Sequence, residues 1–284
     1  MHNLSEVTIG RVHVGDNYPT VFVAEIGTFF NQDIALAQEY LRQIASSGAQ
    51  LFKTEILHDP NVCLDTDLVH KYQHYSGFSE ENYRKLIERK CVPLDDYRQL
   101  FKECNRLNMP YIATVYDFAG VDFLVESGGS AIKIARDNVN NLPLIRHSAR
   151  TGLPIIFDAG QVYFDEIALA LRTAQSFGSG EVIINHHPGS NPAPAANHNM
   201  KILAKYKESF GIPVGLSCHY QGDEMLYVAV AMGANLLEKG VVEDPTIVEQ
   251  DLVSAAKLSE VPQIVQKVQN CWEAIGNAHV MPTE

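Results

Sequence analysis

The chain has 284 residues, 46% of them hydrophobic, which is enough to bury one large core. The net charge of -12 argues against nucleic acid or an anionic membrane surface as the main partner, because either would require a basic face. Five scattered cysteines without a C-x-x-C pair suggest neither a disulfide framework nor a thiolate zinc site. No apolar run approaches the ~18 residues of a membrane span, and we expect a soluble, cytoplasmic protein.

Short apolar runs rich in β-branched residues alternate with amphipathic helical patterns, which is typical of parallel βα units. The predicted strands are 21–27, 49–55, 111–117, 131–135, 154–159, 181–187, 213–219 and 235–240. The predicted helices are 32–47, 94–107, 119–127, 141–151, 163–177, 197–210, 223–232 and 248–275. This repetition predicts an α/β fold of the (β/α)8 TIM-barrel type. A doubly wound open sheet is less favoured, because no G-x-G-x-x-G motif follows the first strand.

Two further segments complete the predicted domain. Residues 7–18 predict a short N-terminal hairpin that closes the bottom of a barrel spanning about 20–276. The insertion 56–93 contains Pro, Gly, His and Tyr and is expected to pass over the top of the barrel. Residues 1–284 are therefore expected to form a single barrel domain.

The clearest chemical signal lies at the C-terminal ends of the predicted strands. Side chains two residues apart share a face of a strand. The pairs that share a face at these ends each include at least one polar or ionisable residue: Glu25 and Gly27, Lys53 and Glu55, Thr114 and Tyr116, Lys133 and Ala135, Asp158 and Gly160, Ser217 and His219, and Glu238 and Gly240. In a (β/α)8 barrel these ends form the rim where active sites are built. A single charge there fits a structural ion pair, but convergence of both signs of charge favours a charged ligand.

Lys133 raises a question of its own. It lies in the apolar run AIKIA (131–135), and a buried ammonium group is costly without an anionic partner. We expect Lys133 to point into the barrel mouth and to meet a phosphate or carboxylate of a small anion there.

At these strand ends the chain resembles the sialic acid synthase family. These barrel enzymes condense phosphoenolpyruvate with an N-acylated hexosamine to make nine-carbon 2-keto acids. The resemblance covers roughly residues 8–270, and it rests on AEIG (24–27), KTE (53–55), KIA (133–135), AGQ (159–161), NPAP (191–194), GLSCH (215–219), GAN (233–235) and LEK (237–239). It implies a transferase that works as a cytoplasmic homodimer on phosphoenolpyruvate and an aldehyde.

The resemblance also implies roles for individual residues. Lys53 and Lys133 would hold the carboxylate and phosphate of phosphoenolpyruvate, Glu25 would contact the acceptor or a water, and Asp251 would be directed toward the acceptor. The candidate catalytic residues are Glu25, Lys53, Glu55, Lys133, Glu238 and Asp251. The candidate substrate-binding residues are Thr114, Tyr116, Arg136, Asn138, Asp158, Asn191, Ser217 and Lys239.

A divalent metal, manganese or magnesium, is the expected cofactor. His219 matches one of two metal-binding histidines in the resembled family, but Gly240 stands in place of the second. His186 could replace it, since the sixth and seventh strands are neighbours, with carboxylate oxygens completing the site. Alternatively, His186 and His187 are hydrogen-bonded rim residues. A metal-free variant that relies on cationic side chains also stays open.

Other departures fall at the substrate side. FFNQ (29–32) replaces an N-H-N-G motif, Arg136 and Asp158 replace two serines, and Asn191 replaces a tyrosine. The chain is also expected to lack the C-terminal antifreeze-like domain of typical members. These differences put the usual N-acetylmannosamine specificity in doubt.

Two classes of function follow. The favoured hypothesis is a synthase that joins phosphoenolpyruvate to a sugar or sugar-like aldehyde, releases phosphate and forms a 2-keto-3-deoxy acid. The alternatives are altered chemistry on the same barrel, such as enolpyruvyl transfer or a metal-free aldol or lyase step, and a non-catalytic binding subunit.

Overall fold

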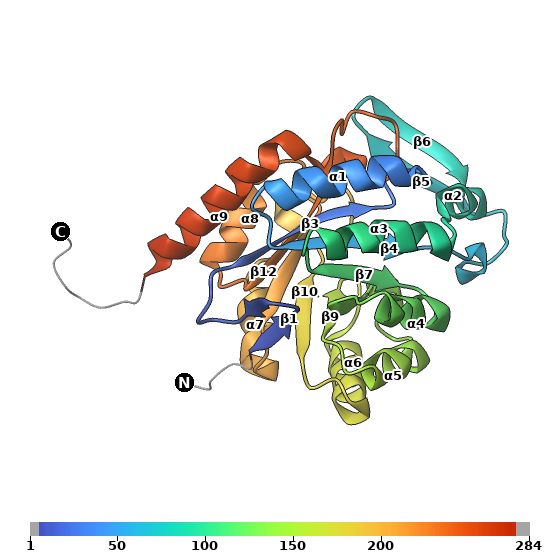
Figure 1. Cartoon of the computed structure of the whole chain (residues 1–284). Helices are drawn as coiled ribbons and strands as arrows, with labels where there is room; N and C mark the ends of the chain where they lie inside the picture. The colour runs from blue at the N-terminus through green and yellow to red at the C-terminus, as the bar shows by residue number, and fades with distance from the viewer. Residues whose placement is uncertain (1–5, 277–284) are drawn as a thin grey trace.

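The computed structural model describes residues 6–276, in which eight parallel strands close into a barrel surrounded by helices (Figure 1). The barrel strands are β3 (Val21–Gly27), β4 (Leu51–Ile56), β7 (Tyr111–Val115), β8 (Ala131–Ile134), β9 (Ile155–Ala159), β10 (Val182–His186), β11 (Val214–Cys218) and β12 (Leu236–Val242). Each strand pairs with the next in chain order, and β12 pairs with β3 to close the ring. The predicted fold class is confirmed.

Helices follow the strands and cover the outside of the barrel (Figure 1). They are α1 (Ile34–Ser46), α3 (Leu94–Arg106), α4 (Phe118–Glu126), α5 (Leu142–Arg150), α6 (Phe164–Phe177), α7 (Ile202–Phe210), α8 (Glu224–Ala231) and α9 (Val261–Ile275). No helix between residues 6 and 276 is long and apolar enough to cross a bilayer.

The prediction of a continuous final helix over 248–275 is wrong at its start. Helix α9 begins at Val261, and its first turn contains Pro262, a residue that favours helix starts. Upstream, Asp251 has a positive φ of 70°, which a continuing right-handed helix does not allow. Residues 256–257 pair with β12 as the short strand β13 (Ala256–Lys257). The apolar spacing of this segment therefore supports a folded loop that crosses the barrel mouth.

The N-terminal hairpin is confirmed. Strands β1 (Val7–Ile9) and β2 (Val12–Val14) pair antiparallel, and Val7, Ile9 and Val14 are fully buried. They pack against inward-facing residues of the barrel strands that include Val23, Leu51, Ile112, Ala131, Ile156, Ile183 and Leu236. An apolar layer thus fills the lower half of the barrel interior.

Two residues further along each strand, the inward-facing side chain changes from apolar to polar. Leu51 is followed in this way by Lys53, and Ile156 by Asp158. The full polar layer consists of Glu25, Lys53, Thr114, Lys133, Asp158, Asn185, Ser217 and Glu238. The alternation of strand side chains therefore builds a polar floor directly above the apolar core.

The insertion after β4 forms a separate flap beside the mouth, at the upper right of Figure 1. It comprises the antiparallel strands β5 (Val69–His74) and β6 (Gly77–Asn82) and the helix α2 (Tyr83–Lys90). His70, Tyr72 and Tyr83 from this flap line the cavity at the C-terminal ends of the barrel strands. The insertion thus adds a wall to the mouth, as the sequence predicted.

Candidate active site

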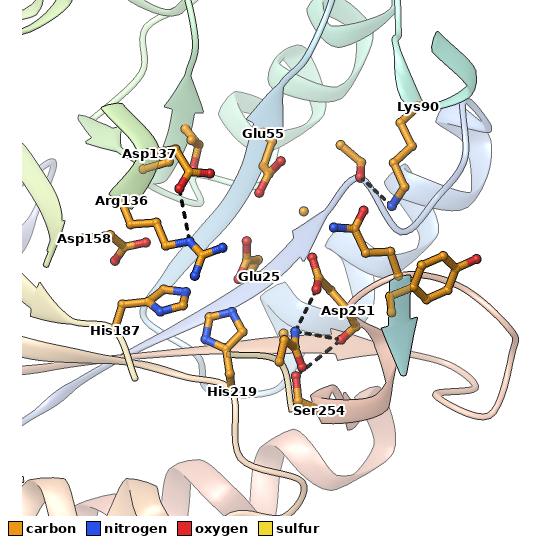
Figure 2. Close-up of a pocket in the computed structure, with 18 of the residues that line it drawn as sticks. Glu25, Glu55, Lys90, Arg136, Asp137, Asp158, His187, His219, Asp251 and Ser254 are labelled. Atoms are coloured by element: carbon orange, nitrogen blue, oxygen red, sulfur yellow. Dashed lines mark hydrogen bonds and ion pairs between the residues drawn. The ribbon is translucent and has the colours of Figure 1, made fainter. Parts of the chain in front are cut away.

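A cavity of about 630 Å³ opens at the C-terminal ends of the barrel strands, a size suited to a small-molecule ligand. Thirteen of the predicted site residues line it: Glu25, Lys53, Glu55, Thr114, Tyr116, Lys133, Arg136, Asn138, Asp158, Asn191, His219, Glu238 and Asp251. Figure 2 shows several of these side chains directed into the same space. The strand ends therefore converge as the parity of the sequence indicates.

Five buried or nearly buried ionisable residues form what we call the floor cluster: Glu25, Lys53, Lys133, Asp158 and Glu238. The ammonium group of Lys133 lies 2.8 Å from Asp158 Oδ2 and also contacts Glu238. The ammonium group of Lys53 contacts Glu25 and lies 3.4 Å from Glu238 Oε1. Lys133 therefore meets anionic partners from its own chain, which is the structural ion pair that the sequence left open as the alternative to a bound anion.

The charges of the floor cluster are set by burial and by these contacts. Burial alone would lower the pKa of both lysines, but the nearby carboxylates outweigh it and raise each pKa, so both side chains are ammonium groups. Burial would raise the pKa of Glu238, but Lys133 and Lys53 lower it to about 2. Burial raises the pKa of Glu25 to about 8 despite Lys53. At neutral pH, Glu238 is ionised and Glu25 carries a proton.

A second carboxyl group stands beside the floor cluster. Glu55 lies 4.0 Å from Lys53, and its Oε2 accepts a 2.7 Å hydrogen bond from the Tyr116 hydroxyl. Burial, followed by the charge of Glu55, raises the pKa of Tyr116 well above its usual value, so the phenol stays protonated and donates. Glu55 is thus fixed at the cavity wall near Glu25.

On the opposite wall, the loop after β12 presents Asp251. Its Oδ1 accepts a 2.9 Å hydrogen bond from Asn191 Nδ2, which joins this loop to the loop after β10. The neighbouring Glu249 is buried and bonds to Arg89 and Lys90 of the flap. These contacts hold Asp251 at the outer edge of the cavity (Figure 2).

Three nitrogen-bearing side chains, Arg136, His187 and His219, line the remaining wall (Figure 2). The centroids of the two imidazole rings are 4.3 Å apart. Arg136 Nη1 donates to Gln161 Oε1 at 2.9 Å and to the carbonyl of Gly189 at 2.8 Å. Burial, followed by the neighbouring positive charges, lowers the pKa of His187 well below its usual value, so its ring is neutral.

Comparison with protein families matches residues 40–280 to the NeuB family. The chain belongs to the NeuB family. The described structure carries this family's barrel, and the resemblance inferred from the strand-end motifs is confirmed.

Individual relatives are distant. The chain is 24% identical over 274 residues to the N,N'-diacetyllegionaminic acid synthase of Legionella pneumophila, covering 95% of this chain and 77% of the relative. It is 23% identical to the N-acetylneuraminate-9-phosphate synthase of Homo sapiens, covering 93% of this chain and 73% of the relative. A crystal structure of the N-acetylneuraminic acid (sialic acid) synthetase of Leptospira borgpetersenii superposes with a TM-score of 0.89, at 23% identity and over 99% of this chain and 94% of that one. At this low identity, the similarity to the Leptospira structure supports the fold alone.

Three predicted site residues lie off the cavity lining. Ser217 is buried beneath it and donates to Asp158 Oδ1 at 2.5 Å. His186 Nε2 bonds to the carbonyl of His198 at 2.7 Å. Lys239 donates to the carbonyls of Tyr220 and Gly222 at 2.6 and 2.9 Å. Ser217 thus supports the floor cluster, whereas the contacts of His186 and Lys239 are with neighbouring loops.

The sequence placed the insertion at the mouth but did not identify which side chains of the flap reach the cavity. Lys90 lines the cavity, donates to Thr28 Oγ1 at 3.3 Å and lies 3.3 Å from Glu249 Oε1. Tyr72 and Tyr83 add aromatic surface from the same insertion. The only signal in the sequence was the density of His and Tyr in residues 56–93.

NeuB family enzymes typically use a divalent metal. Within residues 6–276, no three His, Cys, Asp or Glu side chains are grouped closely enough to hold an ion. At position 240, where the resembled motif has a histidine, a Cβ would lie only 3.2 Å from the ring of Phe29, so this ring would have to shift to admit any side chain there. His186 is turned toward His198. The described residues therefore do not fit the expected metal.

Proposed function

We propose that this NeuB family protein is a synthase that condenses phosphoenolpyruvate with a sugar or sugar-like aldehyde, releasing phosphate and forming a 2-keto-3-deoxy acid. The observation that carries the proposal is the convergence of Lys53 and Lys133 with Glu25 and Glu238 at the barrel mouth. Two ammonium groups fixed in a buried site present N–H donors to the carboxylate of phosphoenolpyruvate without reorganisation during the reaction, while its phosphate group requires a further cation.

The reaction forms one carbon–carbon bond. Carbon 3 of phosphoenolpyruvate bonds to the aldehyde carbon, and the aldehyde oxygen takes up a proton. Water then adds to carbon 2, and departure of phosphate leaves the 2-keto group. One group must donate a proton, another must accept one from water, and both must reach the same cavity.

Glu25 and Glu55 suit these two tasks. Glu25 carries a proton at neutral pH, because burial raises its pKa to about 8, and it is the donor to the aldehyde oxygen. Glu55, held by the Tyr116 hydroxyl, is the acceptor for the proton of the attacking water. Both carboxyl groups line the cavity, next to Lys53.

In this proposal the aldehyde acceptor lies against the wall that carries Asp251 and Asn191, which we call the outer wall. Asp251 and Asn191 present a carboxylate and an amide that hydrogen-bond to hydroxyl groups, and Thr114 and Asn138 add polar lining. Tyr72 and Tyr83 of the flap provide aromatic surface for the apolar face of a sugar. The named products of the relatives, legionaminic and neuraminic acid derivatives, are consistent with an acceptor of this class.

The test is a product assay on the purified full chain. Phosphoenolpyruvate is incubated with a panel of aldoses and N-acylated hexosamines, with and without manganese, while phosphate release and product mass are measured. The expected product contains the acceptor plus the three carbons of pyruvate. Lys53→Met should abolish formation, whereas the exposed Lys102→Met on α3 serves as the matched control. Absence of product across the panel, together with absence of phosphoenolpyruvate binding by calorimetry, would contradict the proposal.

One observation favours a second candidate, an aldol or lyase step without a phosphate-bearing substrate. Asp158 stands where the resembled family has a serine, and its carboxylate already occupies Lys133. In this case the protein would release pyruvate from a 2-keto-3-deoxy acid without consuming or producing phosphate. A coupled pyruvate assay with such acids separates the two functions.

A further inference from the structure

The floor cluster leaves little positive charge for a phosphate group. Four carboxyl groups, those of Glu25, Glu55, Asp158 and Glu238, lie around the ammonium groups of Lys53 and Lys133. Even with Glu25 protonated, the carboxylates outnumber the lysines. A phosphate placed against Lys133 would also meet the carboxylate of Asp158, 2.8 Å from the same ammonium group. A phosphate group therefore needs a cation outside the floor cluster.

Arg136 supplies that cation. Its Nη1 is used by Gln161 and by the Gly189 carbonyl, and its Nε lies 3.3 Å from Asp137, an exposed carboxylate. Within the described residues 6–276, its Nη2 group has no hydrogen-bond acceptor. The guanidinium plane is thus fixed by three contacts, while one of its nitrogen atoms remains available at the cavity wall. Guanidinium groups held in this way bind phosphate oxygens with good geometry.

His187 places a second donor beside it. The backbone N–H of Gly189 donates to His187 Nδ1 at 2.9 Å, so Nδ1 carries a lone pair. A neutral imidazole with an accepting Nδ1 must carry its proton on Nε2. This Nε2–H also lacks an acceptor among residues 6–276. In Figure 2 the His187 ring lies below and to the left of the Arg136 guanidinium, and both residues line the same cavity.

We propose that Arg136 and His187 form a two-donor clamp for the phosphate group of the substrate, with His187 acting as a neutral Nε2–H donor. We call this pair the rim clamp. Gly189 positions both members, because its N–H sets the tautomer of His187 and its carbonyl holds Arg136. Identifying the phosphate as that of phosphoenolpyruvate rests on the proposed function, but binding of a phosphate group by the rim clamp does not.

The backbone makes room for this arrangement. A Cβ on Gly160 would lie 2.7 Å from His187 Cβ and 3.0 Å from His187 Nδ1. The His187 ring therefore packs directly over the backbone of Gly160, and any larger residue there must displace it. The substitution Gly160→Ala changes the position of the imidazole without changing its chemistry, which gives an independent test.

Binding of inorganic phosphate to the full chain, measured by calorimetry, tests the rim clamp. Loss of one charge-assisted hydrogen bond should raise the dissociation constant about 10- to 100-fold, and this is expected for both Arg136→Met and His187→Phe. His187→Gln, whose amide can place an N–H near the position of Nε2, should restore binding to within about threefold. Arg150→Met on α5 removes an equal charge far from the mouth and is the matched control, expected to bind as the wild type does.

Two further measurements test the tautomer and the position of the His187 ring. Long-range ¹H–¹⁵N spectra of the imidazole should show His187 protonated on Nε2, and Gly160→Ala should weaken phosphate binding while the thermal midpoint confirms folding. Pyruvate, which lacks phosphate, should bind equally to wild type and His187→Phe. Unchanged phosphate binding in folded Arg136→Met and His187→Phe would overturn the rim clamp, as would an equal loss of pyruvate binding.

The outcomes also separate the rim clamp from the proposed function. If the wild type makes a 2-keto-3-deoxy acid and the KM for phosphoenolpyruvate is unchanged in both clamp variants, the function stands and the clamp is wrong. If phosphate binding falls as expected but no aldehyde yields product, the clamp stands and the function is wrong.

Discussion

The floor cluster and the rim clamp are two charged regions of one cavity that are organised differently. In the floor cluster, buried lysines and carboxylates from β3, β4, β8, β9 and β12 form ion pairs with one another. In the rim clamp, loop contacts immobilise Arg136 and His187 but leave one donor of each toward the cavity. Strands thus provide a rigid electrostatic base, whereas loops provide the groups that remain to bind a ligand.

This difference predicts how the two regions respond to substitution. Breaking an ion pair of the floor cluster leaves an uncompensated buried charge, so stability and activity should fall together. Removing a wall residue exposes a group that water can solvate, so activity should fall with little change in stability.

Lys133→Met should have the largest effect. It leaves Asp158 and Glu238 buried without their shared ammonium group, which should cost about 3–5 kcal/mol of unfolding free energy. Product formation should be abolished. Chemical denaturation and the product assay measure the two effects. The double variant Lys133→Met with Asp158→Asn is the control, because removing one unpaired carboxylate should recover part of the stability. If Lys133→Met alone is as stable as the wild type, the residues of the floor cluster are not electrostatically coupled.

Glu25→Gln tests the proton carried by the floor cluster. A general acid contributes about 10²- to 10⁴-fold, so kcat should fall within that range. Because the pKa of Glu25 is raised to about 8, wild-type activity should decrease as the pH rises through about 8. The residual activity of the variant should not show this decrease.

The pH dependence of the stability of Glu25→Gln tests whether folding raises the pKa of Glu25. A carboxyl whose pKa is raised by folding adds stability that is fully present below its unfolded pKa and is lost as pH rises through its folded pKa of about 8. Between pH 6 and pH 9, the thermal midpoint of Glu25→Gln should therefore improve relative to that of the wild type. A constant difference between the two proteins would contradict the raised pKa.

Asp251→Asn addresses the outer wall and should separate activity from stability. The amide retains the size of the side chain and can accept from Asn191, so the unfolding free energy should change by less than about 0.5 kcal/mol. Loss of the carboxylate should raise the KM for the aldehyde about tenfold and leave the KM for phosphoenolpyruvate unchanged. Asp95→Asn, on exposed α3, is the control. Equal changes in both KM values would place Asp251 away from the acceptor.

Much of the floor cluster was predictable, because the two-residue alternation of a strand fixes which side chains point inward. The same rule places Glu238 in the mouth and turns the adjacent Lys239 outward, where it bonds to the Tyr220 and Gly222 carbonyls. Motif matching alone had put both residues at the substrate. The side-chain contacts between different strands were not predictable. The contact of Lys133 with Asp158, for example, depends on the register of two neighbouring strands.

The walls of the cavity were harder to predict, because they depend on loop conformations. The tautomer of His187 is set by one backbone N–H, that of Gly189. The position of Asp251 depends on a positive φ, where apolar spacing had predicted a helix. The flap reaches the mouth through the ion pairs of Arg89 and Lys90 with Glu249, contacts across about 160 residues that no local pattern records.

Glu249→Gln tests this last connection and should have the smallest effect on activity. Glu249 is buried and joins Arg89 and Lys90 of the flap to the loop that carries Asp251. Arg89 is more than a third exposed, so losing the charge should cost only about 1–2 kcal/mol of unfolding free energy. Activity should fall a few-fold through KM for the aldehyde, because Asp251 is held less firmly, and hydrogen exchange should increase in the flap. Glu80→Gln, which removes an exposed ion pair of the same flap, should change neither. If both variants behave alike, the flap does not position the acceptor wall.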